Sequence, residues 1–266
     1  IVHGTSQSGQ TLFIEPTEIV ELNNRLKLAE CAVVDEERRI LAKFSSWVGE
    51  EVDAFAAGVD AAEWLDRIAA AARMADDIIA NAPVIADTSR IALRFARHPL
   101  MLLAERRCVA NDVSIDAGSI LIISGPNAGG KTVALKTTGL CALMTCAGLH
   151  IPAESGSELG WFTDIVTDIG DAQSLEQNLS TFTGHIVRLG ATLASAKSGM
   201  LVLIDEIAAG TDPDQGAALA QAVIEQLVER GVTGIVTTHY PRLKTLGATN
   251  PRTSNGSVGF DLAKME

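Results

Sequence analysis

Apolar and polar positions in the first part of the chain follow a helical period. Between residues 18 and 57 apolar side chains recur with charged residues between them, among them Ile19, Leu22, Leu26, Val33, Ile40, Phe44, Trp47 and Phe55. This spacing predicts one long helix or two helices in line. An alanine-rich run over residues 61–80 has compatible spacing, and Gly58 offers a break between the two runs. Together they predict a helical hairpin that projects as an arm, with an ordinary packed helix pair as the alternative.

After Pro83 the pattern changes to short apolar runs that alternate with helical stretches. We expect strands over residues 90–95, 108–115, 119–124, 162–169, 200–206 and 233–239, and helices over residues 131–146, 181–197 and 213–230. Alternating strands and helices are typical of an α/β fold with a mainly parallel sheet covered by helices. The sequence therefore predicts a helical region over residues 1–82 and an α/β domain over residues 83–266.

Composition and charge narrow the range of functions. Apolar residues make up 47% of the 266 positions, charged residues 20%, and the formal net charge is −12. This balance is typical of a globular protein, and the acidic charge argues against a broad surface that grips nucleic acid. No apolar run is long enough to span a membrane and no signal peptide is evident, so we expect a cytoplasmic protein without a membrane partner. The chain begins at Ile1 and not at Met, which suggests a piece of a longer polypeptide.

The spacing of the cysteines indicates neither a metal site nor a disulfide framework. The four cysteines, Cys31, Cys108, Cys141 and Cys146, form no CxxC pair and do not cluster with histidine. We therefore expect incidental or buried thiols.

The stretch GPNAGGKT, residues 125–132, has the complete spacing GxxxxGKT of a phosphate-binding loop. An apolar strand precedes it and a helix follows, which is the context that such a loop requires. Backbone N–H groups and the helix start would hold the phosphates, Lys131 would neutralise the outer ones, and the Thr132 hydroxyl would bind Mg²⁺. The predicted nucleotide contacts are Gly125, Pro126, Asn127, Ala128, Gly129, Gly130, Lys131, Thr132 and Val133.

Two acidic residues end a later apolar strand, in the stretch LVLIDE. Asp205 can hold the metal through its hydration shell, and Glu206 is placed to polarise an attacking water. A carboxylate at the second position favours hydrolysis over transfer of phosphate to a bound substrate. The sequence therefore predicts an ATPase that uses ATP and Mg²⁺.

Further polar residues are expected near the same edge of the sheet. The strand GIVTTH delivers His239 there, where ligands bind in open α/β folds, and we interpret His239 as a sensor of the γ-phosphate. Ser180 and Thr181 stand at the start of a predicted helix, where they form either an anion site or a plain helix cap.

Several stretches in order resemble the ATPase domain of the MutS family, a branch of the ABC-type P-loop ATPases: GPNAGGKT, DIGDAQSLEQNLSTF, LVLIDEIAAGTDP and TTHYPRLK. Others resemble the second bacterial MutS subfamily, the recombination-suppressing branch that often carries a C-terminal Smr nuclease domain: GTSQSGQTLFIEP, VELNNRL, ARHPLM and GLHIPA. The resemblance extends over residues 1–261.

The resemblance implies a head-to-tail homodimer of ATPase domains. Ser180 and Thr181 of one subunit would close over ATP bound at residues 125–132 of the other. Residues 1–82 would be part of the lever and clamp arms, which carry the nucleotide state to branched or mismatched DNA, or to ribosomes. These functions belong to DNA repair and recombination suppression, or to ribosome quality control.

Some family features are missing or replaced. Leu-Ser-Thr-Phe stands in place of the LSGGQ signature of transporter ATPases, and neither a mismatch-sensing domain nor an Smr nuclease domain is evident in these residues. Three alternatives to the MutS-like ATPase stay open: a generic ABC-type ATPase with a membrane or protein partner, a small-molecule kinase, and an idle dimerisation module. Stimulation of turnover by a metabolite and not by DNA would favour the kinase.

Overall fold

The computed structural model describes residues 2–10, 12–14, 16–126, 129–170 and 178–258. Side chains are described for residues 4, 6–10, 16–126, 129–170 and 182–258. Asn127 and Ala128 of the predicted phosphate loop, and the side chains of Ser180 and Thr181, therefore lie outside the described residues. The chain divides into two compact units, Ile1–Ile68 and Ala69–Glu266. The division into a helical region over residues 1–82 and an ATPase domain over 83–266 stays a prediction.

The first unit holds a short antiparallel pair, β1 (Val2–Thr5) with β2 (Leu12–Ile14), followed by helix α1 (Thr17–Glu50) and the start of helix α2 (Val52–Asp77). The helices are separated at Glu51, where φ is −110° and ψ is 10°. The predicted break at Gly58 is wrong, because Gly58 lies inside α2. A single glycine costs a helix only about 1 kcal/mol, so the helix can continue through it.

The helical hairpin that the periodicity predicts is not confirmed. Helix α1 buries none of its residues, and Trp47, in its apolar stripe, is 51% exposed. A packed hairpin would bury this stripe between the two helices. The periodicity correctly indicated two long helices, but it carries no information on which surface covers their apolar faces.

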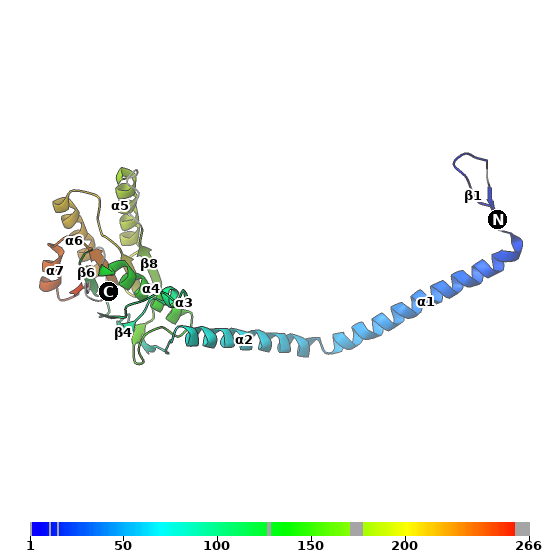
Figure 1. Ribbon diagram of the computed structural model, residues 1–266, viewed down its shortest axis with the longest axis horizontal. Coiled ribbons are helices and arrows are strands. Elements are labelled where there is room, and N and C mark those ends of the chain that lie inside the picture. The colour runs from blue at the N-terminus through cyan, green and yellow to red at the C-terminus, as the bar shows by residue number, and fades with distance from the viewer. Residues whose placement is uncertain (1, 11, 15, 127–128, 171–177, 259–266) are drawn as a thin grey trace. The chain divides into compact units, whose positions relative to one another are not determined.

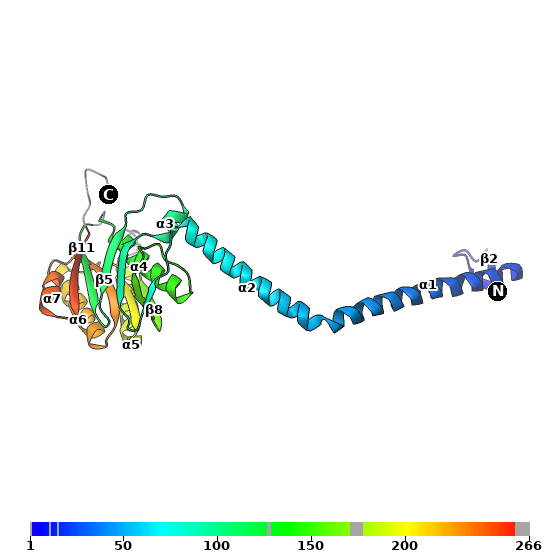
Figure 2. The same cartoon turned by 90° about the horizontal axis from the view of Figure 1, so that it is seen from below.

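A parallel sheet forms the centre of the second unit (Figures 1 and 2). In the described residues its spatial order is β11 (Thr253–Ser257), β6 (Ile120–Ser124), β10 (Thr233–Thr238), β9 (Met200–Ile204) and β8 (Asp164–Asp168). Every neighbouring pair is parallel, with Thr238 opposite Ser124 and Val236 opposite Ile204. The carboxyl ends of β6, β10 and β9 therefore lie beside one another at one edge.

Alternate residues of the sheet pack into two cores on opposite faces. Ile120 and Ile122 of β6 belong to the core that includes residues of α5 (Asn178–Ser195), α6 (Pro213–Glu229) and α7 (Leu243–Thr249). Leu121 and Ile123 belong to the core that includes residues of α4 (Lys131–Cys146) and of a second sheet. Successive strand side chains point to opposite faces, so a sheet covered on both sides requires continuous apolar strands. This explains the uninterrupted apolar runs in the sequence.

The second sheet has the order β3 (Val84–Ala86), β7 (Glu158–Gly160), β4 (Ile91–Ala96) and β5 (Asn111–Ile115) in the described residues. Strand β4 is antiparallel to both β5 and β7, whereas β3 and β7 are parallel. The short helix α3 (Pro99–Leu103) follows β4. This sheet lies beside α4 in the same core.

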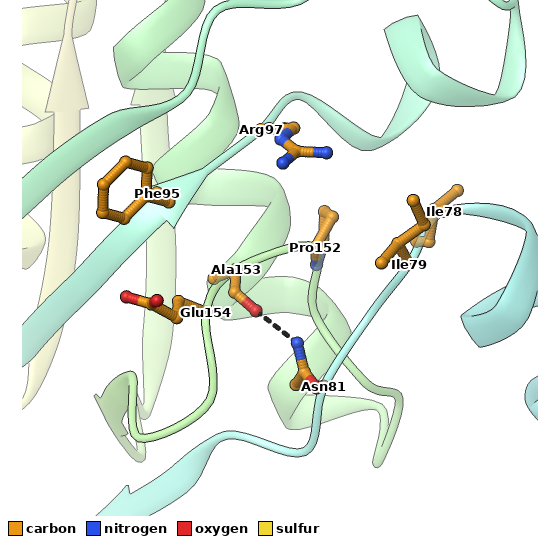
Figure 3. A pocket seen from close by; sticks show the side chains of 8 residues that line it. All are labelled: Ile78, Ile79, Asn81, Phe95, Arg97, Pro152, Ala153 and Glu154. Atoms are coloured by element: carbon orange, nitrogen blue, oxygen red, sulfur yellow. Dashed lines mark hydrogen bonds between the residues drawn. The ribbon is translucent and has the colours of Figure 1, made fainter.

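The C-terminal end of α2 is anchored within the second unit. Asn81 and Ile151 exchange two backbone hydrogen bonds, each N–H donating to the other residue's carbonyl oxygen. Asn81 Nδ2 also donates to Ala153 O at 2.8 Å (Figure 3). Next to these contacts is a cavity of about 250 Å³, lined among others by Ile79 and Phe95. The segment that follows α2 is therefore joined by hydrogen bonds to the loop that follows α4.

The α/β class and the mainly parallel sheet are confirmed. The predicted helices agree with α4, α5 and α6, and the predicted strands with β4, β5, β6, β8, β9 and β10, within a few residues at each end. Over the described residues, no helix combines the length and the apolar character that crossing a bilayer requires.

Candidate functional site

Gly125 and Gly130, between β6 and α4, have backbone conformations that suit glycine. All of β6 is buried, and α4 begins at Lys131 after Gly130, whose φ is 78°. This left-handed conformation suits glycine, since a side chain there is strained. At Gly125 an added Cβ would lie 3.1 Å from Val258 O, so a larger residue there would also crowd the backbone of Val258 in the same chain. The two glycines thus permit a tight turn directly before a helix start, where backbone N–H groups favour anions.

Lys131 is the first residue of α4 and is only 3% exposed. Its Nζ donates to Gly125 O at 2.6 Å and to Pro126 O at 3.0 Å, so the side chain folds back over the loop. Burial lowers the pKa of the Lys131 ammonium, and the nearby negative charges of Glu206 and Asp205 oppose that shift. A poorly hydrated cation beside a helix start is a strong attractor for phosphate.

Thr132 and Asp205 join the loop to the end of β9. Thr132 Oγ1 donates to Asp205 Oδ2 at 2.7 Å. The other oxygen, Asp205 Oδ1, accepts from Thr237 Oγ1 at 2.5 Å. Both carboxylate oxygens are therefore oriented by hydroxyl groups from neighbouring parts of the site, one from α4 and one from β10.

Glu206 and His239 meet at the same edge. Glu206 Oε1 lies 3.1 Å from His239 Nε2, and both side chains are partly exposed. The backbone of Glu206 has a φ of +49°, which is uncommon for a residue with a side chain. Its N–H donates to Thr237 Oγ1 at 2.7 Å, which holds this conformation in place. A carboxylate in such a position can accept a proton from a water molecule between it and a bound phosphate.

The structure therefore brings together Lys131, Thr132, Asp205, Glu206 and His239. Lys131 and Thr132 come from the start of α4, which follows β6, and the other three residues follow β9 and β10; these strands are neighbours in the sheet. The donor set fits a nucleotide with Mg²⁺, because it offers an ammonium and a helix start to phosphate and a hydroxyl and a carboxylate to the metal. No group of three or more His, Cys, Asp and Glu able to hold a metal occurs in the described part of the chain. The roles of the individual residues stay predictions.

Three residues near this edge were not predicted from the sequence as part of the site: Thr237, Asp168 and His185. Thr237 was visible in TTH as a hydroxyl two positions before His239, but threonine at a strand end usually indicates nothing beyond β propensity. Asp168 at the end of β8 and His185 on α5 are 2.6 Å apart between Oδ2 and Nδ1. They are 17 residues apart in the sequence (185 − 168), so their pairing depends on how α5 packs against the sheet.

Replacing Thr237 with Val keeps the shape of the side chain and removes the hydroxyl. We expect the free energy of unfolding in urea to fall by about 1–3 kcal/mol, because the Glu206 N–H and one Asp205 oxygen lose their partner. The matched control is Thr138→Val, a buried residue of α4 whose hydroxyl donates only within its own helix, to Ala134 O. That change should cost less than about 1 kcal/mol. Equal losses in the two variants would show that the Thr237 hydroxyl does not hold the strand ends together.

Comparison with known proteins shows which family the chain resembles. Residues 121–264 match the family description "MutS domain V", which covers more than half of the chain. The chain is 50% identical over 273 residues to the Endonuclease MutS2 of Thermomicrobium roseum, covering 98% of this chain and 34% of that protein. It is 45% identical over 262 residues to the Endonuclease MutS2 of Lactiplantibacillus plantarum (98% and 33%), and 44% identical over 266 residues to that of Bacillus velezensis (100% and 34%).

The chain spans about a third of the length of these curated relatives. The family match includes the predicted phosphate loop from residue 125, both acidic residues after β9, and His239. The similarity to MutS2 proteins extends over nearly all of the chain, including α1 and α2. The chain belongs to the MutS family, and within it to the MutS2 branch.

Proposed function

We propose that this chain is the ATP-binding and ATP-hydrolysing part of a MutS-like DNA-binding protein. The observation that carries the proposal is the cluster of Lys131, Thr132, Asp205, Glu206 and His239 at one edge of the parallel sheet. Each residue offers the chemistry that one part of Mg²⁺-dependent ATP hydrolysis needs. The small-molecule kinase finds less support, because Glu206 would activate water and not an acceptor molecule.

In this proposal the β- and γ-phosphates of ATP lie against the loop before α4 and against the Lys131 ammonium. Thr132 and Asp205 would hold Mg²⁺, which would supply positive charge to the phosphate oxygens. Glu206 takes a proton from the attacking water, whose oxygen forms a bond to the γ-phosphorus as the bond to the leaving ADP oxygen breaks. His239, 3.1 Å from Glu206, orients that carboxylate and is close enough to the site to respond to the γ-phosphate.

The partners of this chain would be a second copy of itself and, through the full-length protein, nucleic acid or ribosomes. Two ATPase domains, of the ABC type, would form a head-to-tail homodimer in which Ser180 and Thr181 of one copy contact ATP held by the other. Residues 1–82 would be part of a lever and clamp through which the full-length protein grips branched or mismatched DNA, or ribosomes. With a net charge of −12, this chain is not the main source of that grip. The ATPase rate of the full-length protein with branched DNA, duplex DNA or ribosomes distinguishes these partners.

The test is the assembly state of a variant that binds ATP without hydrolysing it. For Glu206→Gln in the full-length protein, saturated with ATP and Mg²⁺, we expect light scattering to report ATP-dependent association through the ATPase domains. ADP in place of ATP should give less association, since the γ-phosphate contributes contacts to both copies. An unchanged mass across the two nucleotides, at high protein concentration, would contradict the shared-ATP dimer.

The relatives carry the name endonuclease, and this chain covers about a third of each. We assign no cleavage of DNA to the residues described here, since the cluster at the sheet edge is arranged for phosphate of a nucleotide bound at a helix start.

A further inference from the structure

Helix α5 makes a specific polar contact with the backbone that follows Glu206. His185 Nε2 accepts a hydrogen bond from the Ala208 N–H at 3.1 Å, and His185 Nδ1 lies 2.6 Å from Asp168 Oδ2. The two side chains are 13% and 6% exposed. This contact joins three elements that are distant in the sequence: the end of β8, helix α5 and the segment after β9.

The hydrogen-bond pattern defines the state of the His185 ring. A backbone N–H can only donate, so Nε2 carries no proton and the ring proton sits on Nδ1, the nitrogen that lies 2.6 Å from Asp168 Oδ2. Burial lowers the pKa of His185, which agrees with a neutral ring, while the charge of Asp168 opposes the shift. Asp168 is oriented in turn by Arg188, whose Nε donates to Asp168 Oδ1 at 2.6 Å. The imidazole is thus held in one tautomer and one direction.

The segment that His185 contacts has an unusual backbone. Glu206 and Ala208 have φ values of +49° and +56°, a region that costs energy for residues with a side chain. Several contacts hold the segment: Glu206 N–H donates to Thr237 Oγ1, and Tyr240 Oη donates to Ala208 O at 2.8 Å. Ala208 is fully buried, so without His185 its N–H would lack a partner and could not turn to water.

We infer that His185 is a positioning residue that holds the backbone of Glu206–Ala208 in its strained conformation and ties it to α5. The inference rests on the proposed function, in which Ser180 and Thr181 at the start of α5 contact ATP bound to the second copy. When α5 of one copy binds that ATP, its position is transmitted through His185 to Glu206 of the same copy. Glu206 carries the carboxylate that activates water in the proposed function.

The test compares two replacements in the full-length protein. His185→Phe keeps a ring and removes the acceptor, and we expect kcat for ATP to fall roughly ten- to a hundredfold with KM changed by less than about threefold. His185→Gln restores an acceptor near the position of Nε2, together with an N–H that can face Asp168. Its kcat should return to within about threefold of the original.

A matched control separates positioning from general damage to α5. Leu193→Ala removes apolar contacts of the same helix and leaves the acceptor for Ala208 in place. It should lower the free energy of unfolding and keep kcat within about twofold of the original, measured at a temperature where the variant stays folded. If the protein without substitutions hydrolyses ATP and His185→Phe does so equally fast, or if Gln and Phe are equally impaired, the inference is overturned. Absence of Mg²⁺-dependent hydrolysis in the unsubstituted protein would instead overturn the proposed function.

Discussion

Replacing Glu206 with Gln should lower the ATP turnover rate by about a hundred- to ten-thousandfold and leave ATP affinity nearly unchanged. The amide keeps the size of the side chain and can still bond His239, which lies 3.1 Å from the carboxylate. It cannot accept a proton from water, so the step that activates the nucleophile is lost. Phosphate release at saturating ATP and Mg²⁺ measures the turnover, and titration with a fluorescent ATP analogue measures the binding.

The matched control for this substitution is Glu229→Gln at the end of α6. Glu229 is exposed and accepts a hydrogen bond from Gln226, away from the residues of the site. The same change of charge there should leave turnover within about twofold of the original, because long-range effects of an exposed charge are screened. Normal turnover in Glu206→Gln would remove Glu206 from the role of general base.

Replacing Lys131 with Ala should weaken ATP binding by about a hundredfold or more. The Lys131 ammonium is buried at the start of α4, and its present acceptors are carbonyl oxygens of the loop, Gly125 O and Pro126 O. Phosphate oxygens would offer it charge-assisted bonds in the same place, so its loss removes the main positive charge of the cradle. The same fluorescent-nucleotide titration measures the effect, and hydrolysis should fall with it.

Lys136→Ala provides the comparison for Lys131→Ala. Lys136 lies on the same helix, carries the same charge and is exposed. Its removal should change ATP affinity by less than about threefold, since an exposed charge contributes little. Undiminished affinity in Lys131→Ala, or equal losses in the two variants, would refute the assignment of Lys131 to the outer phosphates.

The helices and strands nearest the site could be predicted from the sequence because they depend on local patterns of residues. Strands β6 and β9 begin with continuous apolar runs, and each is followed by residues that carry the candidate chemistry. Helix α6 begins after Asp212, whose side chain accepts from the N–H groups of Asp214 and Gln215, with Pro213 at its first position. Such caps and periods depend on residues a few positions apart, which a single sequence displays directly.

Edge strand β11 was not predicted. Its residues, TSNGS, have no apolar alternation, yet they pair in parallel with β6. Pairing supplies the backbone hydrogen bonds that the polar sequence alone does not suggest, and Gly256 fits against Leu121 and Ile123 of the neighbouring strand. Strand identity here follows from the free edge of β6 and not from the residues of β11.

Local patterns in the chain were sufficient for the α/β class, which the structure confirms, and for predicting the phosphate loop and the acidic pair Asp205–Glu206, because each depends on neighbours along the backbone. Only the tertiary structure shows the order of the strands. It also shows the hydrogen bonds of Thr237 with both acidic residues and the contact of His185 with Ala208. These contacts join residues 23 to 32 positions apart, and their formation depends on how strands pair and helices pack.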